Sequence, residues 1–69
     1  MSMQSLEPTE QERRAILAVA EHGTIRAAAQ SLNLSPHTVD AHLDHLRNKC
    51  GLRHLPQLVW LAARRGWLD

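Results

Sequence analysis

Apolar residues recur along this chain with helical spacing, and no stretch shows the apolar–polar alternation that is typical of a strand. The pattern predicts four helices. The first follows Thr9 and runs to about His22, and the others cover 25–32, 36–50 and about 56–65. The connections between them are short. We therefore expect an all-α fold, a compact four-helix domain.

The sequence also indicates where these helices begin and end. Thr9 and Glu12 form a capping-box pattern, in which each side chain can hydrogen-bond the backbone amide of the other residue. Ser35 and Pro36 provide a cap followed by proline at the first helical position, where its missing N–H is harmless. Gly23 suits the end of the first helix because glycine adopts a left-handed conformation easily.

The third helix has the clearest separation of apolar and polar sides. Its apolar positions form a narrow stripe that we expect in the core: Val39, Leu43, Leu46 and Cys50. The opposite side is polar or small: His37, Asp40, Ala41, Asp44, His45 and Asn48. A short alanine-rich helix, a tight turn and a longer helix with a polar outer side together predict a helix-turn-helix, whose second helix enters the major groove of DNA.

Composition limits what else the chain can be. With 69 residues it forms one small domain, in which 1–8 show no periodicity and are expected to be a flexible N-terminal arm. The single Cys50 excludes an intramolecular disulfide, and no apolar run is long enough to span a membrane. The net charge is +1, with −1 over 1–34 and +2 over 35–69, which permits a polyanionic partner without requiring one.

Residues 9–68 resemble the LuxR-type (GerE-like) DNA-binding domain of bacterial transcription regulators. The match includes Thr9, Glu12, Ala29 and Leu32, and it is densest over Ser35-Pro36-x-Thr38-Val39-x-x-His42-Leu43, Lys49-x-Gly51-Leu52 and Gln57-Leu58-Val59. The resemblance implies a domain over 9–69, major-groove binding by the third helix and dimerisation through the fourth. It also implies a free-standing member of the family, because no receiver or sensing domain precedes the motif.

From this resemblance we expect a set of DNA-contact residues on the second and third helices: Arg26, His37, Thr38, Asp40, Ala41, His42, Asp44, Arg47 and Lys49. Thr38 and Lys49 are the strongest candidates for phosphate contacts, and Arg26 is a weaker one. Asp40 stands where the family commonly has a basic residue, and Asp44 stands where some relatives have a lysine. DNA binding should therefore be weaker than in typical relatives, or differently specific, since a carboxylate repels phosphate but can accept from cytosine.

Simpler interpretations of the same residues remain open. Asp40, Asp44 and Arg47 can form a solvated, locally paired surface, and Cys50 is expected to be a buried, inert thiol. His42 and His45 share one side of a helix, but no further ligands accompany them at a suitable spacing. Solvated or phosphate-contacting histidines are therefore favoured over a metal site, and we expect no metal and no cofactor.

The fourth helix is apolar on more than one side. One stripe can close the core: Leu58, Leu61 and Ala62, with Val59 at its edge. The other side is expected to form a homodimer interface: Trp60, Ala63 and Arg64, together with Trp67 just beyond Gly66. For Trp67 the alternative is that it folds back over the core as the hydrophobic contact that follows a helix stop.

The sequence thus predicts a sequence-specific, DNA-binding transcriptional regulator that acts as a homodimer on double-stranded DNA. Other transcription proteins are possible partners, and the location would be cytoplasmic and nucleoid-associated. The alternative is a helix-turn-helix repurposed for protein–protein contact, for which Asp40 and Asp44 are the best indication. An enzyme is not expected, because the chain has no nucleophile–base set, no phosphate-binding loop and no catalytic residues.

Overall fold

The computed structural model describes residues 7–69, which form four helices and no strand. These are α1 (Glu10–His22), α2 (Ile25–Leu32), α3 (Pro36–Cys50) and α4 (Leu55–Arg64). The predicted all-α fold is confirmed, and α4 lies one residue earlier than the sequence indicated. The flexible arm expected over 1–8 falls mostly outside the described residues. Within 7–69, no helix combines the length and the apolar character that crossing a membrane requires.

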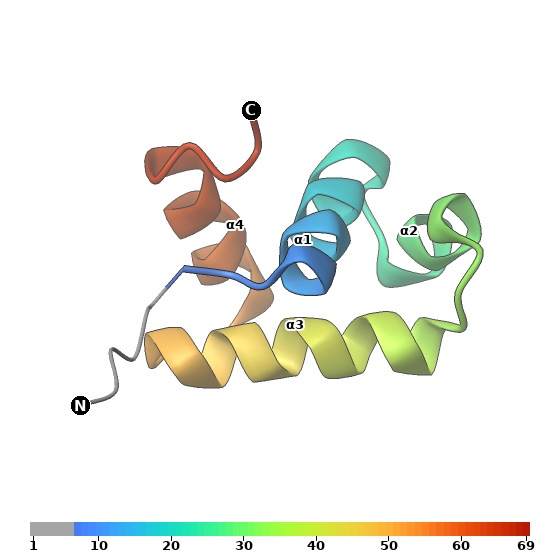
Figure 1. Cartoon of the computed structure of the whole chain (residues 1–69), viewed down its shortest axis with the longest axis horizontal. Coiled ribbons are helices and arrows are strands. Elements are labelled where there is room, and N and C mark those ends of the chain that lie inside the picture. Colours follow the sequence, from blue (N-terminus) through green and yellow to red (C-terminus); the bar gives the residue numbers. More distant parts are fainter. Residues whose placement is uncertain (1–6) are drawn as a thin grey trace.

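The helix α3 lies along one side of the molecule, and the other three helices pack over it (Figure 1). Contacts join α1 to α2, α3 and α4, so α1 is central, with α2 and α4 to either side of it. The α2–α3 pair, connected through Asn33, Leu34 and Ser35, forms the predicted helix-turn-helix. The side of α3 that faces away from the other helices is therefore free to meet a partner.

Local sequence explains the turn between α2 and α3. Asn33 ends α2 in the left-handed region at φ 61°, which asparagine tolerates better than most residues. Ser35 then caps α3, where its side-chain oxygen accepts from the backbone N–H of Thr38 at 3.1 Å, and Pro36 occupies the first turn. Ala28 and Ala29 are buried in α2, and their small side chains let α3 approach closely.

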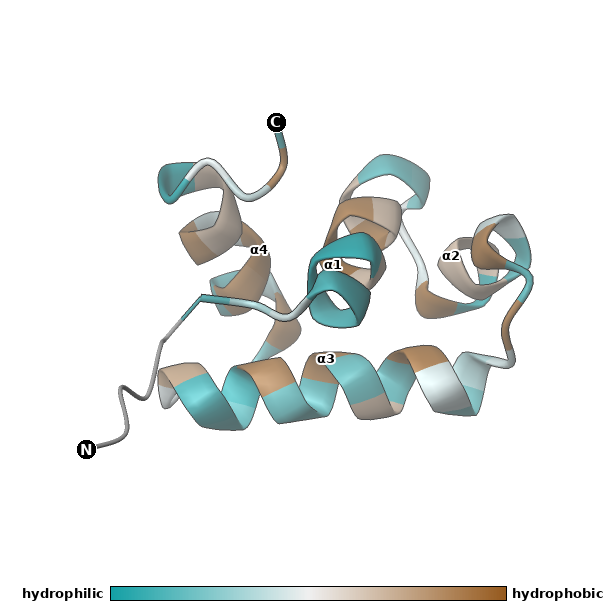
Figure 2. Cartoon of the chain, viewed as in Figure 1, coloured by the Kyte–Doolittle hydropathy of each residue, from teal (hydrophilic) through white to brown (hydrophobic). Residues whose placement is uncertain are grey.

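One apolar cluster holds the helices together. In Figure 2 the hydrophobic positions of α3 lie toward the other helices, and its hydrophilic positions lie along the free side. The predicted stripe is buried at Val39, Leu43 and Leu46, while Cys50 packs against the cluster and is only partly buried. The cluster continues through these residues: Ala15, Ile16, Ala18, Val19, Ala28, Ala29, Leu58, Ala62 and Trp67.

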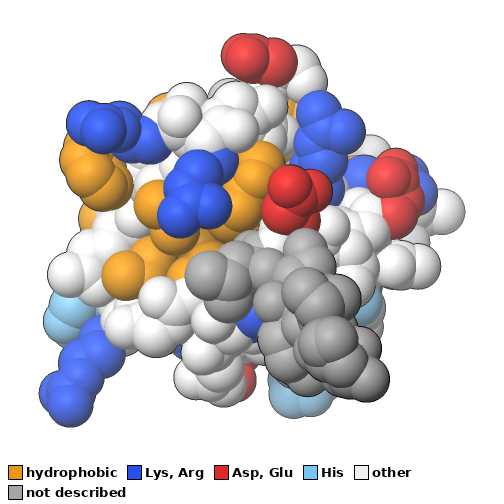
Figure 3. Space-filling model, turned by 60° about the vertical axis from the view of Figure 1, so that its left-hand side comes forward, with side chains coloured by type: hydrophobic (Ala, Val, Ile, Leu, Met, Phe, Trp, Pro, Cys, Tyr) orange, Lys and Arg blue, Asp and Glu red, His pale blue; other side chains and the backbone are white. Residues whose placement is uncertain are grey.

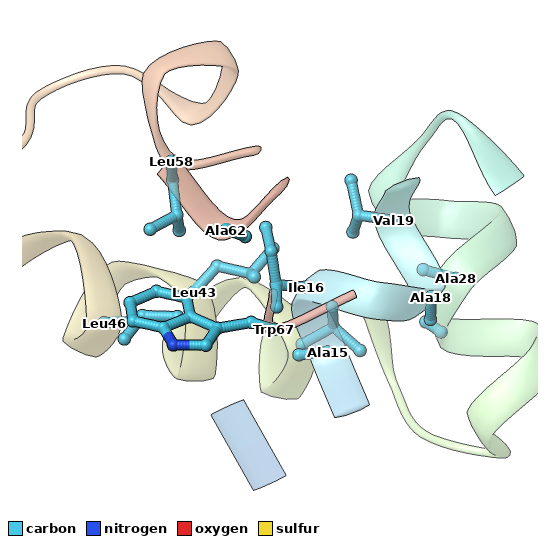
Figure 4. Packing of buried hydrophobic residues seen from close by; sticks show 12 residues of the cluster. Ala15, Ile16, Ala18, Val19, Ala28, Leu43, Leu46, Leu58, Ala62 and Trp67 are labelled. Carbon is cyan, nitrogen blue, oxygen red and sulfur yellow. The ribbon is translucent and has the colours of Figure 1, made fainter. Parts of the chain in front are cut away.

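Trp67 belongs to this core, so its assignment to a dimer interface was wrong. Only 8% of its surface is exposed, and its indole lies among Ile16, Leu43 and Leu46 (Figure 4). Gly66, at φ +76°, turns the chain back after α4, and the Trp67 amide donates to the carbonyl of Ala62 at 2.9 Å. This is the hydrophobic contact beyond a glycine stop that the sequence left as the alternative.

A side chain of α1 fixes the segment that follows α4. The guanidinium of Arg13 donates from Nε to the carbonyl of Trp67 at 3.0 Å. Its Nη2 donates to the backbone oxygen of Asp69 at 2.8 Å. Two hydrogen bonds therefore tie residues 67–69 to the start of α1, which helps to hold the indole of Trp67 in the core.

Candidate nucleic-acid interface

The outer face of α3 is the surface opposite its buried stripe. It is formed by exposed residues from successive turns of the helix: His37, Asp40, Ala41, Asp44, His45 and Asn48. Four of these were predicted as DNA contacts, and the structure brings all four onto one surface. On a straight helix, side chains opposite a buried stripe point away from the rest of the domain. The outer face can therefore meet a partner without displacing any other helix.

One carboxylate of this face is already paired within the chain. Asp44 Oδ1 accepts from Arg47 Nη2 at 2.6 Å, and Arg47 Nη1 donates to the carbonyl of Arg53 at 2.6 Å. Arg47 is 24% exposed, so its guanidinium sits at the edge of the outer face, held toward the α3–α4 connection. The local pairing that was expected as an alternative thus holds for Asp44 and Arg47, and it offsets one of the two negative charges.

Lys49 lies away from the outer face, in an ion pair with α1. Its Nζ donates to Glu12 Oε1 at 2.8 Å and to the backbone carbonyl of Glu7 at 3.2 Å, and only 18% of its side chain is exposed. A phosphate contact would require the ammonium to leave a buried carboxylate, which is costly. We therefore withdraw Lys49 as a phosphate contact and assign it to the packing of α3 on α1.

Glu12 is the buried centre of a cluster that the sequence did not predict. Glu12 is only 2% exposed, and its two carboxylate oxygens accept hydrogen bonds from three donors. Oε1 accepts from Lys49 Nζ and from the Thr9 backbone N–H at 2.9 Å, and Oε2 lies 2.6 Å from His45 Nδ1. Burial raises the pKa of Glu12, but hydrogen bonds from Lys49, His45 and Thr9 outweigh it and lower the pKa from 4.5 to about 2.

Glu12 was recognised from the sequence only as part of the capping box, which the structure confirms. Its further partners are 33 and 37 positions away along the chain. One feature of the sequence could have indicated this cluster. His45 and Lys49 are four positions apart on neighbouring turns of α3, so both can reach the same group on a neighbouring helix. Which group that is depends on how α1 crosses α3.

The remaining predicted contacts lie on the flanks of α3 or on α2. His42 is partly buried and lines a hollow of about 160 Å³ with Gln11, Arg14, Leu32 and Leu34, so it faces α1 and the turn. The hydroxyls of Thr38 and Ser35 are 2.9 Å apart at the start of α3. Arg26 is exposed near the start of α2. Within 7–69 no group of three His, Cys, Asp or Glu side chains is placed to hold a metal ion.

Cys50 is the last residue of the apolar stripe of α3, and it is a partly buried, free thiol. Burial raises its pKa above the usual 9.0, although Lys49 and Arg65 act in the opposite direction. A raised pKa keeps the sulfur in its thiol form at neutral pH, and a thiol is a poor nucleophile. Cys50 therefore has the chemistry of a packing residue.

A second exposed surface lies on α4. Trp60 is 62% exposed, and the guanidinium carbon of Arg64 is 5.1 Å from the centre of its ring. A shallow hollow of about 420 Å³ lies beside the indole, lined by Leu52, Pro56, Gln57, Trp60 and Leu61. Figure 3, which brings this end of the molecule forward, shows hydrophobic side chains next to those of Lys or Arg. Trp60, Ala63 and Arg64 are all exposed here, as a partner surface requires.

Comparison with known proteins adds a family to this geometry. Residues 11–57 match the family of bacterial regulatory helix-turn-helix proteins of the lysR type. The chain is 45% identical over 62 residues to the "Putative HTH-type transcriptional regulator Mb0914c" of Mycobacterium bovis. It is equally similar to the "Putative HTH-type transcriptional regulator Rv0890c" of Mycobacterium tuberculosis. Both alignments cover 90% of this chain but only 7% of the relative. No solved structure matches the chain significantly.

The helix-turn-helix part of the expected resemblance is confirmed, while its LuxR-type label is wrong because the matching family is lysR. Several of the residues that suggested LuxR have general structural roles in this domain: Ser35 caps α3, Pro36 follows it, and Val39 and Leu43 are buried in the core. They therefore indicate the motif more strongly than a family. Both relatives are described as putative HTH-type transcriptional regulators, which agrees with the helix-turn-helix formed by α2 and α3. The chain belongs to the bacterial regulatory helix-turn-helix proteins of the lysR family.

Proposed function

We propose that this domain binds double-stranded DNA by placing the outer face of α3 in the major groove, as the sequence-reading module of a transcription regulator. The observation that carries the proposal is the free side of α3, where His37, Asp40, Ala41 and Asp44 are all exposed while the opposite stripe is buried. An α-helix fits the major groove, whose base edges differ for each base pair. In this proposal the domain is a binding module without enzymatic activity, located at the nucleoid in the cytoplasm.

The side chains of the outer face favour particular base contacts. The carboxylate of Asp40 can accept a hydrogen bond from the amino group of cytosine, and the methyl group of Ala41 can contact that of thymine. Asp44 is less available, because Arg47 already donates to it. Two carboxylates on this face repel phosphate, so specific pairing has to supply a larger share of the affinity than in a basic recognition helix.

Contacts with the DNA backbone would come from the flanks. We retain Thr38, at the start of α3, and Arg26, exposed on α2, as candidates, because a helix-turn-helix lays the ends of both helices near phosphates. His42 is a weaker candidate, since it lies partly buried beside Arg14 and Leu34.

We further propose that two copies associate through the α4 surface of Trp60, Ala63 and Arg64. The support is the exposure of a large indole beside an apolar hollow, because tryptophan is enriched at the centres of interfaces. A two-fold dimer would place two α3 helices about 34 Å apart, so that each reads a half-site in successive major grooves.

Selection of bound duplexes from a random-sequence pool tests the proposed function. The wild-type chain should enrich a preferred sequence, and Asp40→Lys should bind random duplex more tightly and change the preference at one position of each half-site. Glu21→Lys is the matched control, because it makes the same charge change at an exposed position of α1. If Asp40→Lys behaves like Glu21→Lys, the outer face of α3 does not contact DNA.

Contact with another protein is the second candidate, and the acidic outer face favours it. Asp40 and Asp44 are both exposed there, and Lys49 is withdrawn into its ion pair with Glu12. A basic partner surface would suit this face better than phosphate does. Failure of the wild-type chain to enrich or retain any duplex at low salt would favour this candidate.

A further inference from the structure

His45 combines an anchored nitrogen with an exposed one. Its Nδ1 lies 2.6 Å from Glu12 Oε2, yet 74% of the side chain is exposed, whereas only 3% of the Glu12 side chain is. The buried carboxylate thus holds one edge of the ring, and the other edge, with Nε2, is left toward solvent. The sequence placed His45 on the polar side of α3 and left open whether it is solvated or contacts a phosphate, without including it in the expected set of DNA-contact residues.

The chemistry of Glu12 determines which nitrogen carries a proton. The lowered pKa of Glu12 keeps it ionised at neutral pH, and an ionised carboxylate can only accept hydrogen bonds. The Nδ1 of His45 must therefore be the donor. Because Thr9 and Lys49 also donate to the same carboxylate, it cannot rotate away, and the ring keeps its orientation.

The position of His45 on α3 suits a contact with a DNA strand better than a contact with a base. On α3 it stands one helical turn after Ala41 and one turn before Lys49, so it lies at the edge of the outer face, beside the flank that meets α1. When the outer face occupies the major groove, side chains at such a flank meet the phosphates that border the groove.

We propose that His45 binds a backbone phosphate of DNA through Nε2–H in its protonated form, with Glu12 as the positioning residue. This inference rests on the proposed binding of DNA by α3.

The charged groups around His45 largely offset one another, so the charge of its own ring determines the net charge of this surface. From α1, the carboxylate of Glu12 faces it, and on α3 the ammonium of Lys49 shares that carboxylate, so the two charges largely cancel. The neighbouring carboxylate of Asp44 is paired with Arg47. Protonation of His45 therefore changes a nearly neutral surface into a cationic one. A phosphate beside the ring stabilises the cation, so binding takes up a proton and affinity rises as pH falls.

Binding to a duplex obtained from the selection above, measured at pH 6 and pH 8, tests the inference. Relative to wild type, His45→Gln should bind about tenfold more weakly at pH 6 and within about twofold at pH 8, because it lacks the charge-assisted bond. At pH 6 it should also lower the salt slope by about one. His45→Arg keeps a permanent cation and should bind tightly at both pH values.

The other histidines make a matched control possible. The chain has four other histidines, His22, His37, His42 and His54, so the comparison is the difference between wild type and each variant. His54→Gln is the control because His54 is exposed beyond α3. It should leave the wild-type profile unchanged. An equal loss of duplex affinity at pH 6 in His54→Gln and in His45→Gln would overturn the assignment to His45.

A separate measurement tests whether Glu12 positions the ring of His45. Nitrogen-15 NMR of the free protein should show that the neutral ring of His45 carries its proton on Nδ1. In Glu12→Gln that preference should weaken and the affinity gain at pH 6 should shrink. Should Glu12→Gln fail to fold, the wild-type spectrum alone decides, because a proton on Nε2 contradicts positioning by Glu12.

Replacing single phosphates of the duplex by neutral methylphosphonates locates the contact. One substitution should remove the difference between wild type and His45→Gln at pH 6. If wild type binds the duplex but no methylphosphonate substitution removes this difference, the inference about His45 fails while the proposed function stands. If wild type binds no duplex at either pH, the proposed function itself fails.

Discussion

The ammonium of Lys49 and the carboxylate of Glu12 are 37 positions apart in the chain, and they lie 2.8 Å apart between α3 and α1. Both side chains are mostly covered, at 18% and 3% exposed. A hydrogen-bonded ion pair in such a place fixes how one helix crosses another, because any sliding of α3 leaves a charge buried without its partner. The pair therefore sets the orientation in which α3 presents its outer face.

Lys49→Ala should lower the free energy of unfolding by about 3 kcal/mol, since it leaves the Glu12 carboxylate buried with one donor fewer. Urea denaturation at neutral pH measures this loss. The salt slope of DNA binding, taken where the variant is still folded, should match that of wild type. Arg26→Ala is the control and should behave in the opposite way, with little change in stability and a salt slope lower by about one. A lowered slope for Lys49→Ala would return Lys49 to the interface.

Stability should also depend on pH through Glu12. The pKa of Glu12 is 4.5 in its ordinary state and about 2 in the fold, so the folded chain binds this proton less tightly than the unfolded chain. The stabilisation is complete above pH 4.5 and is lost as pH falls toward 2, by about 3 kcal/mol. Urea denaturation between pH 6 and pH 2 should show this fall, and it should be much smaller in Glu12→Gln. Glu10→Gln, exposed on the same helix, should leave the fall unchanged.

The sequence predicted those parts of the molecule that depend on near neighbours. The cap at Thr9, the left-handed Gly23 and the stripe of Val39, Leu43 and Leu46 follow from residues within a few positions of one another, and all are confirmed. Lys49 was misassigned because its partner depends on the crossing of α1 and α3, which no local pattern contains.

The same limit applies to the candidate site. Helical periodicity placed His37, Asp40 and Ala41 together on the outer face, where the structure has them. It could not distinguish an exposed indole from a buried one at the end of the chain, because Trp67 reaches the core only through the turn at Gly66 and the hydrogen bonds from Arg13. Those contacts are formed in the folded domain alone.

Arg13→Ala should loosen the segment after α4 without unfolding the domain. The variant loses the hydrogen bonds to the backbone oxygens of Trp67 and Asp69, which together contribute about 1 kcal/mol because Arg13 is exposed. Hydrogen exchange of the Trp67 amide, which donates to Ala62, should become about five times faster. Arg14→Ala, at the next exposed position, is the control and should leave that amide unchanged. Equal exchange in wild type and Arg13→Ala would show that Gly66 alone sets the turn.

The two tryptophans should respond in opposite ways to truncation. Trp67 is 8% exposed in the core, so Trp67→Ala should cost about 3–5 kcal/mol of unfolding free energy, most or all of the stability of a small domain. Trp60 is 62% exposed, with the guanidinium of Arg64 over its ring, so Trp60→Ala should leave the domain folded. Urea denaturation followed by circular dichroism measures both. In Trp60→Ala the remaining fluorescence comes from Trp67 and should report a buried indole.

Sedimentation equilibrium then tests the dimer that we propose. Removing an indole from the centre of an interface weakens association by about 2 kcal/mol or more, so Trp60→Ala should sediment as a monomer at concentrations where wild type is dimeric. It should also bind a paired site far more weakly than wild type, while binding to a single half-site changes little, because the outer face of α3 is untouched. Ala63→Glu is a second variant on the same surface and should act in the same direction, since a buried carboxylate without a partner opposes association. A wild-type chain that sediments as a monomer at high concentration would contradict this interface, and the exposed indole would then need another partner.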